Sequence, residues 1–204
     1  MTDPPRHKVF ISFHHKDQAY KDLFVELMED YIVDKSVRDG DIDDDFLSTE
    51  TIRRRIRDNF IRDATVTVVL IGPCAWQRKH VDWEIGSSLR KTTQNSRCGL
   101  LGLLLPSHPN FRTGKYTPSL IPPRLADNCN GTEPYAYIYD WPTQLMSLAG
   151  MSLWEAIESR TNSEKQIRRW IHEAFIRRSG TPPNNGRPQF KRNRGGYCSR
   201  GWSD

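Results

Sequence analysis

Glu84 places a carboxylate next to the indole of Trp83, shortly after an apolar run at 65–71 that is closed by Gly72 and Pro73. An unbroken run of this kind, rich in β-branched residues and bounded by turn residues, is typical of a parallel strand buried on both faces. In open α/β sheets, ligands bind outside the carboxyl ends of such strands. The two side chains therefore follow directly on the place where a ligand would lie.

The segment 74–90 is predicted to be a helix, because Val81, Ile85 and Leu89 recur at four-residue spacing. This apolar face turns toward the sheet, and Glu84 lies beside it, near the crevice. The same residues also fit a purely structural interpretation. In that case the neighbouring indole belongs to the core and Glu84 is a solvated helix carboxylate.

Other patterns that carry chemistry are missing from the sequence. It has no Gly-rich phosphate loop, no G-x-S-x-G elbow and no H-E-x-x-H helix. His14, His15 and His80 lack further ligands at zinc-like spacing, so no metal site is predicted. The acidic run 39–45 does not meet the ligand positions of a calcium-binding EF-hand loop, which favours a solvated loop.

Alternating strands and helices would hold these residues in place. The runs 8–13, 99–106 and 135–141 predict the first, fourth and fifth strands. Helical periodicity follows the first strand up to about Val33, a weak second strand comes next, and Ser48 or Thr49 caps a helix before the central strand. This repeated order predicts an α/β fold with a parallel sheet.

The C-terminal part differs in composition. Residues 107–132 show no periodicity and are predicted to form a long loop, whereas apolar residues within 153–175 predict closing helices up to about Arg178. Beyond this point five basic residues face one acidic residue in a stretch rich in Gly, Pro and Asn. We therefore predict a domain at 8–142, a helical extension at 143–178 packed on it, and a disordered basic tail at 179–204.

Composition narrows the class of protein. The chain has 204 residues, of which 36% are hydrophobic and 27% charged, as expected for one globular core with appendages. No segment approaches the roughly 20 apolar residues that span a bilayer, so we expect a cytoplasmic protein without a membrane partner. The four cysteines have neither metal spacing nor the density of a disulfide scaffold, which fits a reducing compartment.

The formal net charge of +5 lies largely in the predicted tail. A basic tail can bind nucleic acid by counterion release, but two aromatic residues are too few for a stacking platform. Solubility is the favoured role, and a nucleic-acid partner is not expected.

The order of motifs resembles a TIR domain, and more narrowly the TIR-like proteins of Thoeris antiphage systems. The motifs are Phe10-Ile-Ser-Phe-His14, Val69-Leu-Ile-Gly72 and Arg78-x-x-Val81-Asp-Trp-Glu-Ile85. The resemblance covers about residues 8–142. It implies a flavodoxin-like fold with a five-stranded, mainly parallel sheet flanked by helices, to which this sequence adds C-terminal helices and a flexible basic tail.

The resemblance also implies an enzyme that cleaves NAD at the nicotinamide glycosidic bond. In this bacterial family, ADP-ribose is released as a signal nucleotide, commonly a cyclic isomer, which activates a partner effector that kills or arrests the infected cell. Glu84 matches the family's catalytic glutamate by position. Its carboxylate would stabilise the positive charge of an oxocarbenium-like state. NAD is the substrate, and no cofactor or metal is expected.

The expected substrate-binding residues surround the same crevice. They are Phe10, Ser12, Phe13, His14, Asp45, Trp76 and Trp83. Those at the end of the first strand can stack on nicotinamide or form hydrogen bonds to the ribose. The phenylalanines fit a place in the core equally well.

The partners implied by the resemblance are NAD, a downstream effector reached through the signal nucleotide, and a phage trigger of unknown identity. The acidic loop departs from the wider TIR pattern, so self-association on activation stays open. Two rival functions remain at this point. One is a non-catalytic TIR adaptor that acts by TIR–TIR contact, and the other is a nucleic-acid binder that uses its basic tail.

Overall fold

A five-stranded sheet forms the centre of the molecule, in the order β2-β1-β3-β4-β5, and every neighbouring pair of strands is parallel. The computed structural model describes residues 4–34, 51, 54–91, 96–142 and 153–203. The strands are β1 (His7–Ser12), β2 (Ile32–Asp34), β3 (Val66–Ile71), β4 (Gly99–Leu104) and β5 (Ala136–Asp140). This flavodoxin-like strand order confirms the predicted α/β fold.

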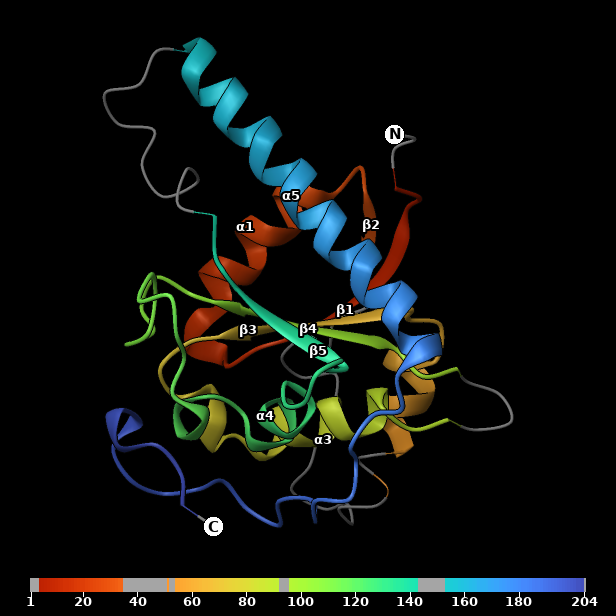
Figure 1. The fold of residues 1–204 in the computed structure, drawn as a ribbon, viewed down its shortest axis with the longest axis vertical. Coiled ribbons are helices and arrows are strands. Elements are labelled where there is room, and N and C mark those ends of the chain that lie inside the picture. Colours follow the sequence, from red (N-terminus) through yellow and green to blue (C-terminus); the bar gives the residue numbers. More distant parts are fainter. Residues whose placement is uncertain (1–3, 35–50, 52–53, 92–95, 143–152, 204) are drawn as a thin grey trace.

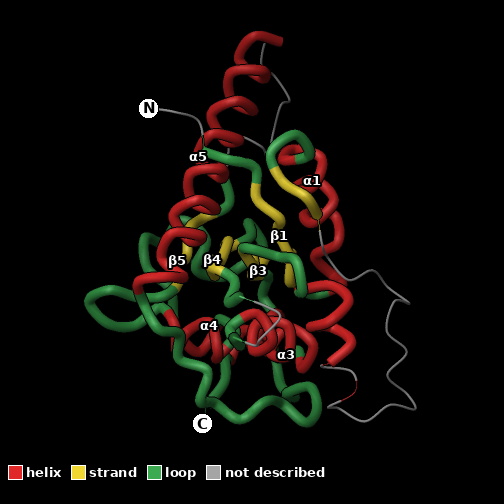
Figure 2. Tube along the Cα trace, turned by 90° about the vertical axis from the view of Figure 1, so that its right-hand side faces the viewer, coloured by secondary structure: helices red, strands yellow, loops and turns green. Residues whose placement is uncertain are grey.

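Helices cover both faces of the sheet, α1 and α5 on one side and α3 and α4 on the other (Figures 1 and 2). Their bounds are α1 (Gln18–Met28), α3 (Lys79–Ser88), α4 (Pro123–Asn128) and α5 (Leu153–Gly180). On β3, Val68 packs with α1 and α5, whereas Val69 packs with α3 and α4. Because successive strand residues point to opposite faces, a strand covered on both sides must be apolar throughout, and β3 is fully buried.

Three elements differ from the sequence-based prediction. Helix α1 ends at Met28, so Ile32 and Val33 lie in β2 and not in the helix that their spacing suggested. The segment 107–132, predicted as a loop, contains the short helix α4. In place of several closing helices, the structure has the single 28-residue helix α5.

Helix α5 rests directly on β4. Ile167, Ile171 and Ala174 enter the core on this face of the sheet. A Cβ atom on Gly99 would lie 2.2 Å from the carbonyl oxygen of Ala174, so no side chain fits at the start of β4. The close approach of helix and strand therefore depends on this glycine.

The segment that follows α5 is ordered, which corrects the prediction of a disordered tail. It runs along the side of the molecule where α3 and α4 lie (Figure 1). Cys198 forms a disulfide with Cys74, Phe190 is buried, and the backbone N–H of Trp202 donates to the carbonyl oxygen of Ser119 over 2.8 Å. Composition reports only the apolar area that a segment can bury, whereas this segment is also held by a cross-link and by hydrogen bonds.

The disulfide also corrects the expectation that all four cysteines are reduced. Cys74 lies just past β3 and Cys198 is 124 residues further along the chain. Cys98 and Cys129 remain free thiols. A separation of this size leaves no local signal in the sequence, because cysteine pairing is decided by which segments meet in the fold.

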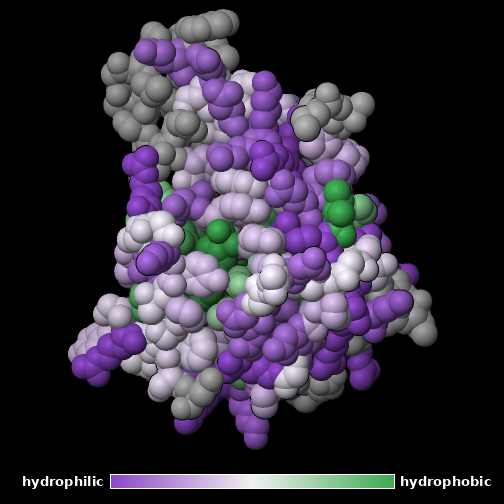
Figure 3. Space-filling model, viewed as in Figure 1, coloured by the Kyte–Doolittle hydropathy of each residue, from purple (hydrophilic) through white to green (hydrophobic). Residues whose placement is uncertain are grey.

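The surface seen in Figure 3 is predominantly hydrophilic, with small and separate hydrophobic patches. Within the described ranges, no helix combines the length and the apolar character needed to cross a membrane.

Candidate active site

Three consecutive residues of α3 are buried and leave the helix in different directions. Asp82 and Trp83 are almost fully buried, and Glu84 is 9% exposed. Successive helical side chains are rotated by about 100°, so Glu84 can face β1 while Asp82 and Trp83 contact the backbone of Phe190. The motif that drew attention in the sequence thus makes contacts on two sides of the helix.

Glu84 faces the carboxyl end of β1. The hydroxyl of Ser12, the last residue of that strand, donates a hydrogen bond to Glu84 Oε2 over 2.5 Å. One helical turn further, Ser88 Oγ donates to the carbonyl oxygen of Glu84 and lies 2.7 Å from Thr67 Oγ1 of β3. A row of polar side chains therefore connects α3 with β1 and β3, within a layer that is otherwise apolar.

The environment of Glu84 changes its ionisation. Burial raises the pKa of the carboxyl from 4.5 to about 8, and the hydrogen bond from Ser12, which favours the carboxylate, opposes only part of this rise. Near neutral pH the group therefore keeps its proton unless a cation lies beside it. A buried carboxyl with a raised pKa at the ligand-binding edge of a sheet is typical of functional sites.

His14 lies two residues past β1 and is buried as a neutral ring. Its Nδ1 atom accepts a hydrogen bond from the backbone N–H of Lys16 over 2.9 Å, which places the proton of the neutral ring on Nε2. Burial, with a smaller effect from Arg78, lowers its pKa to about 4. Among the described residues Nε2 has no hydrogen-bond partner, so the site holds a buried donor that a ligand can use.

Asp17 lies between the carboxyl ends of β1 and β3. Its carboxyl touches Gly72, where an added Cβ atom would lie 2.2 Å from Asp17 Oδ2. Burial raises the pKa of this carboxyl to about 6. The glycine after β3 is thus required for close approach, and a second carboxyl with a raised pKa stands at the same edge.

Arg78 brings a positive charge to this edge, directly before α3. Its charge lowers the pKa of His14, and its buried Nε atom has no hydrogen-bond partner within the described part of the chain. Neither Asp17 nor Arg78 was among the site residues predicted from the sequence, where Arg78 stood only as a motif position. The signal for both was available, because each follows the carboxyl end of a strand on the same sheet edge.

The remaining predicted substrate-binding residues take other positions. Phe10 is fully buried in a cluster with Trp83, and Phe13 packs against the core on the opposite face of the sheet. Trp76 is buried, and its Nε1 donates to the carbonyl oxygen of Cys198 over 3.0 Å. Asp45 lies outside the described residues. The structure therefore brings Ser12 and Glu84 into contact, whereas the side chains of Phe10, Phe13 and Trp76 pack within the protein.

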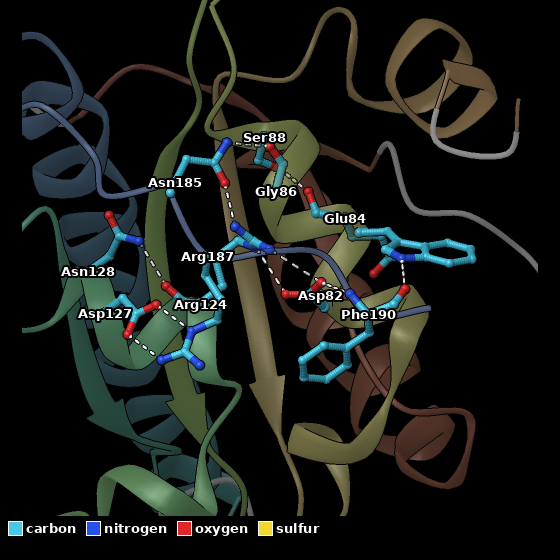
Figure 4. A network of polar contacts seen from close by, with 12 residues as sticks. Asp82, Glu84, Gly86, Ser88, Arg124, Asp127, Asn128, Asn185, Arg187 and Phe190 are labelled. Atoms are coloured by element: carbon cyan, nitrogen blue, oxygen red, sulfur yellow. Dashed lines mark hydrogen bonds and ion pairs between the residues drawn. The ribbon is translucent and has the colours of Figure 1, made fainter. Parts of the chain in front are cut away.

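Asp82 and Trp83 join α3 to the C-terminal segment. Figure 4 shows Asp82 beside Arg124 and Phe190. Asp82 accepts from Arg124 Nε over 3.0 Å and from the backbone N–H of Phe190 over 2.9 Å. The indole N–H of Trp83 donates to the carbonyl oxygen of Phe190 over 2.7 Å, and Arg124 also donates to Asn185. Helix α3, which carries the candidate catalytic carboxyl, is thus held in place by these contacts on the side that faces away from the sheet.

Metal ligands are not gathered at this edge: within the described ranges, no three His, Cys, Asp or Glu side chains are grouped in a way that holds a metal ion. The titratable groups that the site does contain are Glu84, Asp17 and His14, with Arg78 beside them. Their chemistry is that of charge stabilisation and hydrogen bonding to a ligand.

Comparison with protein families matches residues 10–110 to the family described as Thoeris protein ThsB, TIR-like domain. The matched region runs from β1 past β4 and includes the Ser12–Glu84 pair. No curated protein matches the chain significantly.

Proposed function

Because residues 10–110 belong to the TIR-like domain family of the Thoeris protein ThsB, we propose that this antiphage-defence chain cleaves NAD at its nicotinamide glycosidic bond. The observation that carries the proposal is the buried Glu84 carboxyl, held by Ser12 at the carboxyl edge of β1 and β3. Ligands of open α/β sheets bind at this edge. NAD is the substrate, and its cationic nicotinamide is a leaving group that needs no metal or second cofactor.

In the proposed reaction the bond between the ribose anomeric carbon and the pyridinium nitrogen breaks. The electron pair of this bond goes to nicotinamide, which leaves as a neutral molecule, and the ribose passes through an oxocarbenium-like state. An ionised Glu84 stabilises the positive charge that develops on the ribose. The acceptor that then attacks the anomeric carbon determines whether ADP-ribose or a cyclic isomer is the product.

The raised pKa of Glu84 is compatible with this role. The pyridinium of NAD is a cation, and a cation beside a buried carboxyl favours its ionised form. Substrate binding would therefore lower the pKa of about 8 and generate the carboxylate in the complex. The Ser12 hydroxyl would then hold the orientation of the carboxylate as it holds the carboxyl in the free protein.

His14 and Asp17 are proposed to bind the substrate around the reacting bond. The neutral His14 ring offers its Nε2–H as a donor to a ribose hydroxyl or a phosphate oxygen. Arg78 adds positive charge suited to the pyrophosphate. We further propose that the ADP-ribose product is a signal nucleotide, a cyclic isomer, that activates a downstream effector after a phage trigger.

The change Glu84→Gln tests this function. It keeps the size of the side chain and removes its charge, so nicotinamide release should fall by about 100-fold or more, as when a preorganised electrostatic contact is lost. Nicotinamide release from NAD is measured with purified protein, with and without lysate of phage-infected cells. Glu133→Gln is the matched control, because Glu133 is exposed and distant in sequence from the site.

Parental nicotinamide release by the Glu84→Gln protein would contradict the assignment. If neither protein releases nicotinamide under any condition while TIR–TIR association is observed, the adaptor function replaces the enzymatic one.

A further inference from the structure

The C-terminal segment and the connection between β3 and α3 together line an open pocket of about 450 Å³. Its lining residues are Trp76, Phe190, Lys191, Arg192, Asn193, Arg194, Gly195, Gly201, Trp202 and Ser203. Three of them are cationic and three aromatic, and none of these lining residues is acidic. Cations interleaved with aromatic rings are the groups that bind phosphate-bearing, ring-containing ligands.

The pocket is preformed, because its walls are tied to the domain at several points. The Cys74–Cys198 disulfide brings the segment onto the β3–α3 connection, and the indole N–H of Trp76 donates to the carbonyl oxygen of Cys198. The backbone N–H of Arg194 donates to the carbonyl oxygen of Gln77 over 2.8 Å. The indole N–H of Trp202 donates to the carbonyl oxygen of Ile121 over 2.8 Å. Little ordering is therefore left for a ligand to impose.

Arg194 occupies the centre of this arrangement. Its guanidinium lies 4.6 Å from the ring centre of Phe190 and 5.8 Å from that of Trp202. Its Nη1 atom donates to the carbonyl oxygen of Ser203 over 3.3 Å. A planar guanidinium held between rings is oriented for phosphate recognition, and the exposed Lys191 and Arg192 add two further positive charges.

We propose that this pocket binds a free nucleotide with two or more phosphates, at a site separate from the one around Glu84. The volume falls in the range of small-molecule sites, about 300–1,000 Å³, and suits one nucleotide. Single-stranded nucleic acid normally occupies about 4–16 nucleotides per binding module, a longer track than this pocket offers. The phosphates face Lys191, Arg192 and Arg194, and the base contacts Trp202, the half-buried ring of the lining, while Trp76 and Phe190 are buried beneath the pocket.

None of the pocket's lining residues is among Ser12, His14, Asp17 and Glu84. The inference therefore stands independently of the proposed NAD cleavage. At Gly195 the place of a Cβ atom is open space, so the backbone there can be approached closely by a ligand. Three of the five basic residues that looked like a solubilising tail in the sequence, Lys191, Arg192 and Arg194, are thereby gathered into one binding surface.

The test is isothermal titration calorimetry on the full chain with its disulfide intact. The ligands are ADP, pyrophosphate, adenosine and a ten-nucleotide oligothymidine. We expect one ADP per chain, weaker binding of pyrophosphate, and no measurable binding of adenosine. Lys191→Ala combined with Arg192→Ala should weaken ADP binding by about tenfold or more, because charge-assisted contacts to phosphate are lost. Arg200→Ala is the matched control, since Arg200 is an exposed basic residue of the same segment outside the pocket lining. It should change ADP affinity less than twofold.

Absence of ADP binding to the parental chain overturns the proposal, as does ADP binding that the double variant leaves unchanged. Equal weakening by Arg200→Ala would show general electrostatic attraction and no site. Tighter binding of the oligonucleotide than of ADP would identify the surface as a nucleic-acid contact and would also overturn it. Thermal unfolding of each variant checks that the fold is intact. Because Lys191, Arg192 and Arg200 are exposed, their replacement should leave the melting temperature unchanged.

Discussion

At the scale of single residues, Glu84 combines a buried position with one short hydrogen bond. Its carboxyl is shielded by the α3–β1 contact, and Ser12 is its one side-chain partner among the described hydrogen bonds. The pKa of about 8 follows from this shielding. Such a group destabilises the folded protein once it ionises, which is a typical feature of functional carboxyls.

The pH dependence of stability tests this position independently of activity. The folded pKa of about 8 lies above the ordinary value of 4.5, so the folded state keeps a proton that the unfolded state loses. The contribution of the protonated Glu84 carboxyl to the free energy of unfolding is fully present below pH 4.5 and is lost as the pH rises through 8. Gln at position 84 does not ionise, so the melting temperature of Glu84→Gln should exceed that of the parent at pH 9 and approach it at pH 5.

Differential scanning calorimetry of both proteins across this pH range gives the measurement. The expected difference in unfolding free energy at pH 9 is on the order of several kcal/mol, because each pKa unit corresponds to about 1.4 kcal/mol. A difference that does not grow with pH would mean that Glu84 is more exposed to solvent than the structure indicates.

At the scale of elements, α3 is held on both sides by polar contacts. Its inner side meets β1 and β3 through Ser12, Thr67 and Ser88, and its outer side meets α4 through the Asp82–Arg124 ion pair. Both members of that pair are at most 2% exposed. Because buried charges are costly when unpaired, the pair fixes the separation of the two helices only while it is complete.

Arg124→Met should therefore destabilise the protein strongly. It leaves the buried Asp82 carboxylate with the hydrogen bond from the backbone N–H of Phe190, and removal of one member of a buried pair typically costs about 3–5 kcal/mol. Arg169→Met is the control, because its ion pair with Glu173 is largely exposed and such pairs contribute about 0–1 kcal/mol. Urea unfolding compares the two, and similar midpoints would show that the Asp82–Arg124 pair does not stabilise the fold.

At the scale of the whole molecule, the C-terminal segment closes the chain on itself. The Cys74–Cys198 disulfide spans 124 residues, and the same segment contacts α3 and α4 through Phe190, Asn185 and Arg187. Cross-links over long loops stabilise a fold mainly by restricting the unfolded chain. The segment 181–203 is therefore part of the folded unit.

Both Cys198→Ser and truncation after Arg178 should lower the melting temperature. The loss of a native disulfide typically costs about 2–5 kcal/mol, and truncation removes the hydrogen bonds as well, so its effect should be larger. Cys129→Ser is the control, because Cys129 is a free thiol. When a dithiol reductant is added, the melting temperature of the parent protein should fall toward that of Cys198→Ser. Unchanged melting after truncation would restore the interpretation of a solvated tail.

The sequence by itself determined the sheet, the helix that carries Glu84 and the edge at which that residue lies. Apolar runs at 66–71 and 99–104 and the four-residue spacing of α3 report burial directly, because each pattern reflects the covering of its own element. The family match covers residues 10–110, the range in which these patterns lie. Glu84 could thus be selected before any contact was known.

Only the tertiary structure decided which groups meet. Ser12 and Glu84 are 72 residues apart, and Cys74 and Cys198 are 124 apart. Such pairings depend on how distant elements pack, and periodicity carries no information about them. The order of the C-terminal segment was hidden for the same reason: composition measures the apolar area that a segment can bury alone, whereas this segment is stabilised by partners on α3 and α4 and by a covalent cross-link.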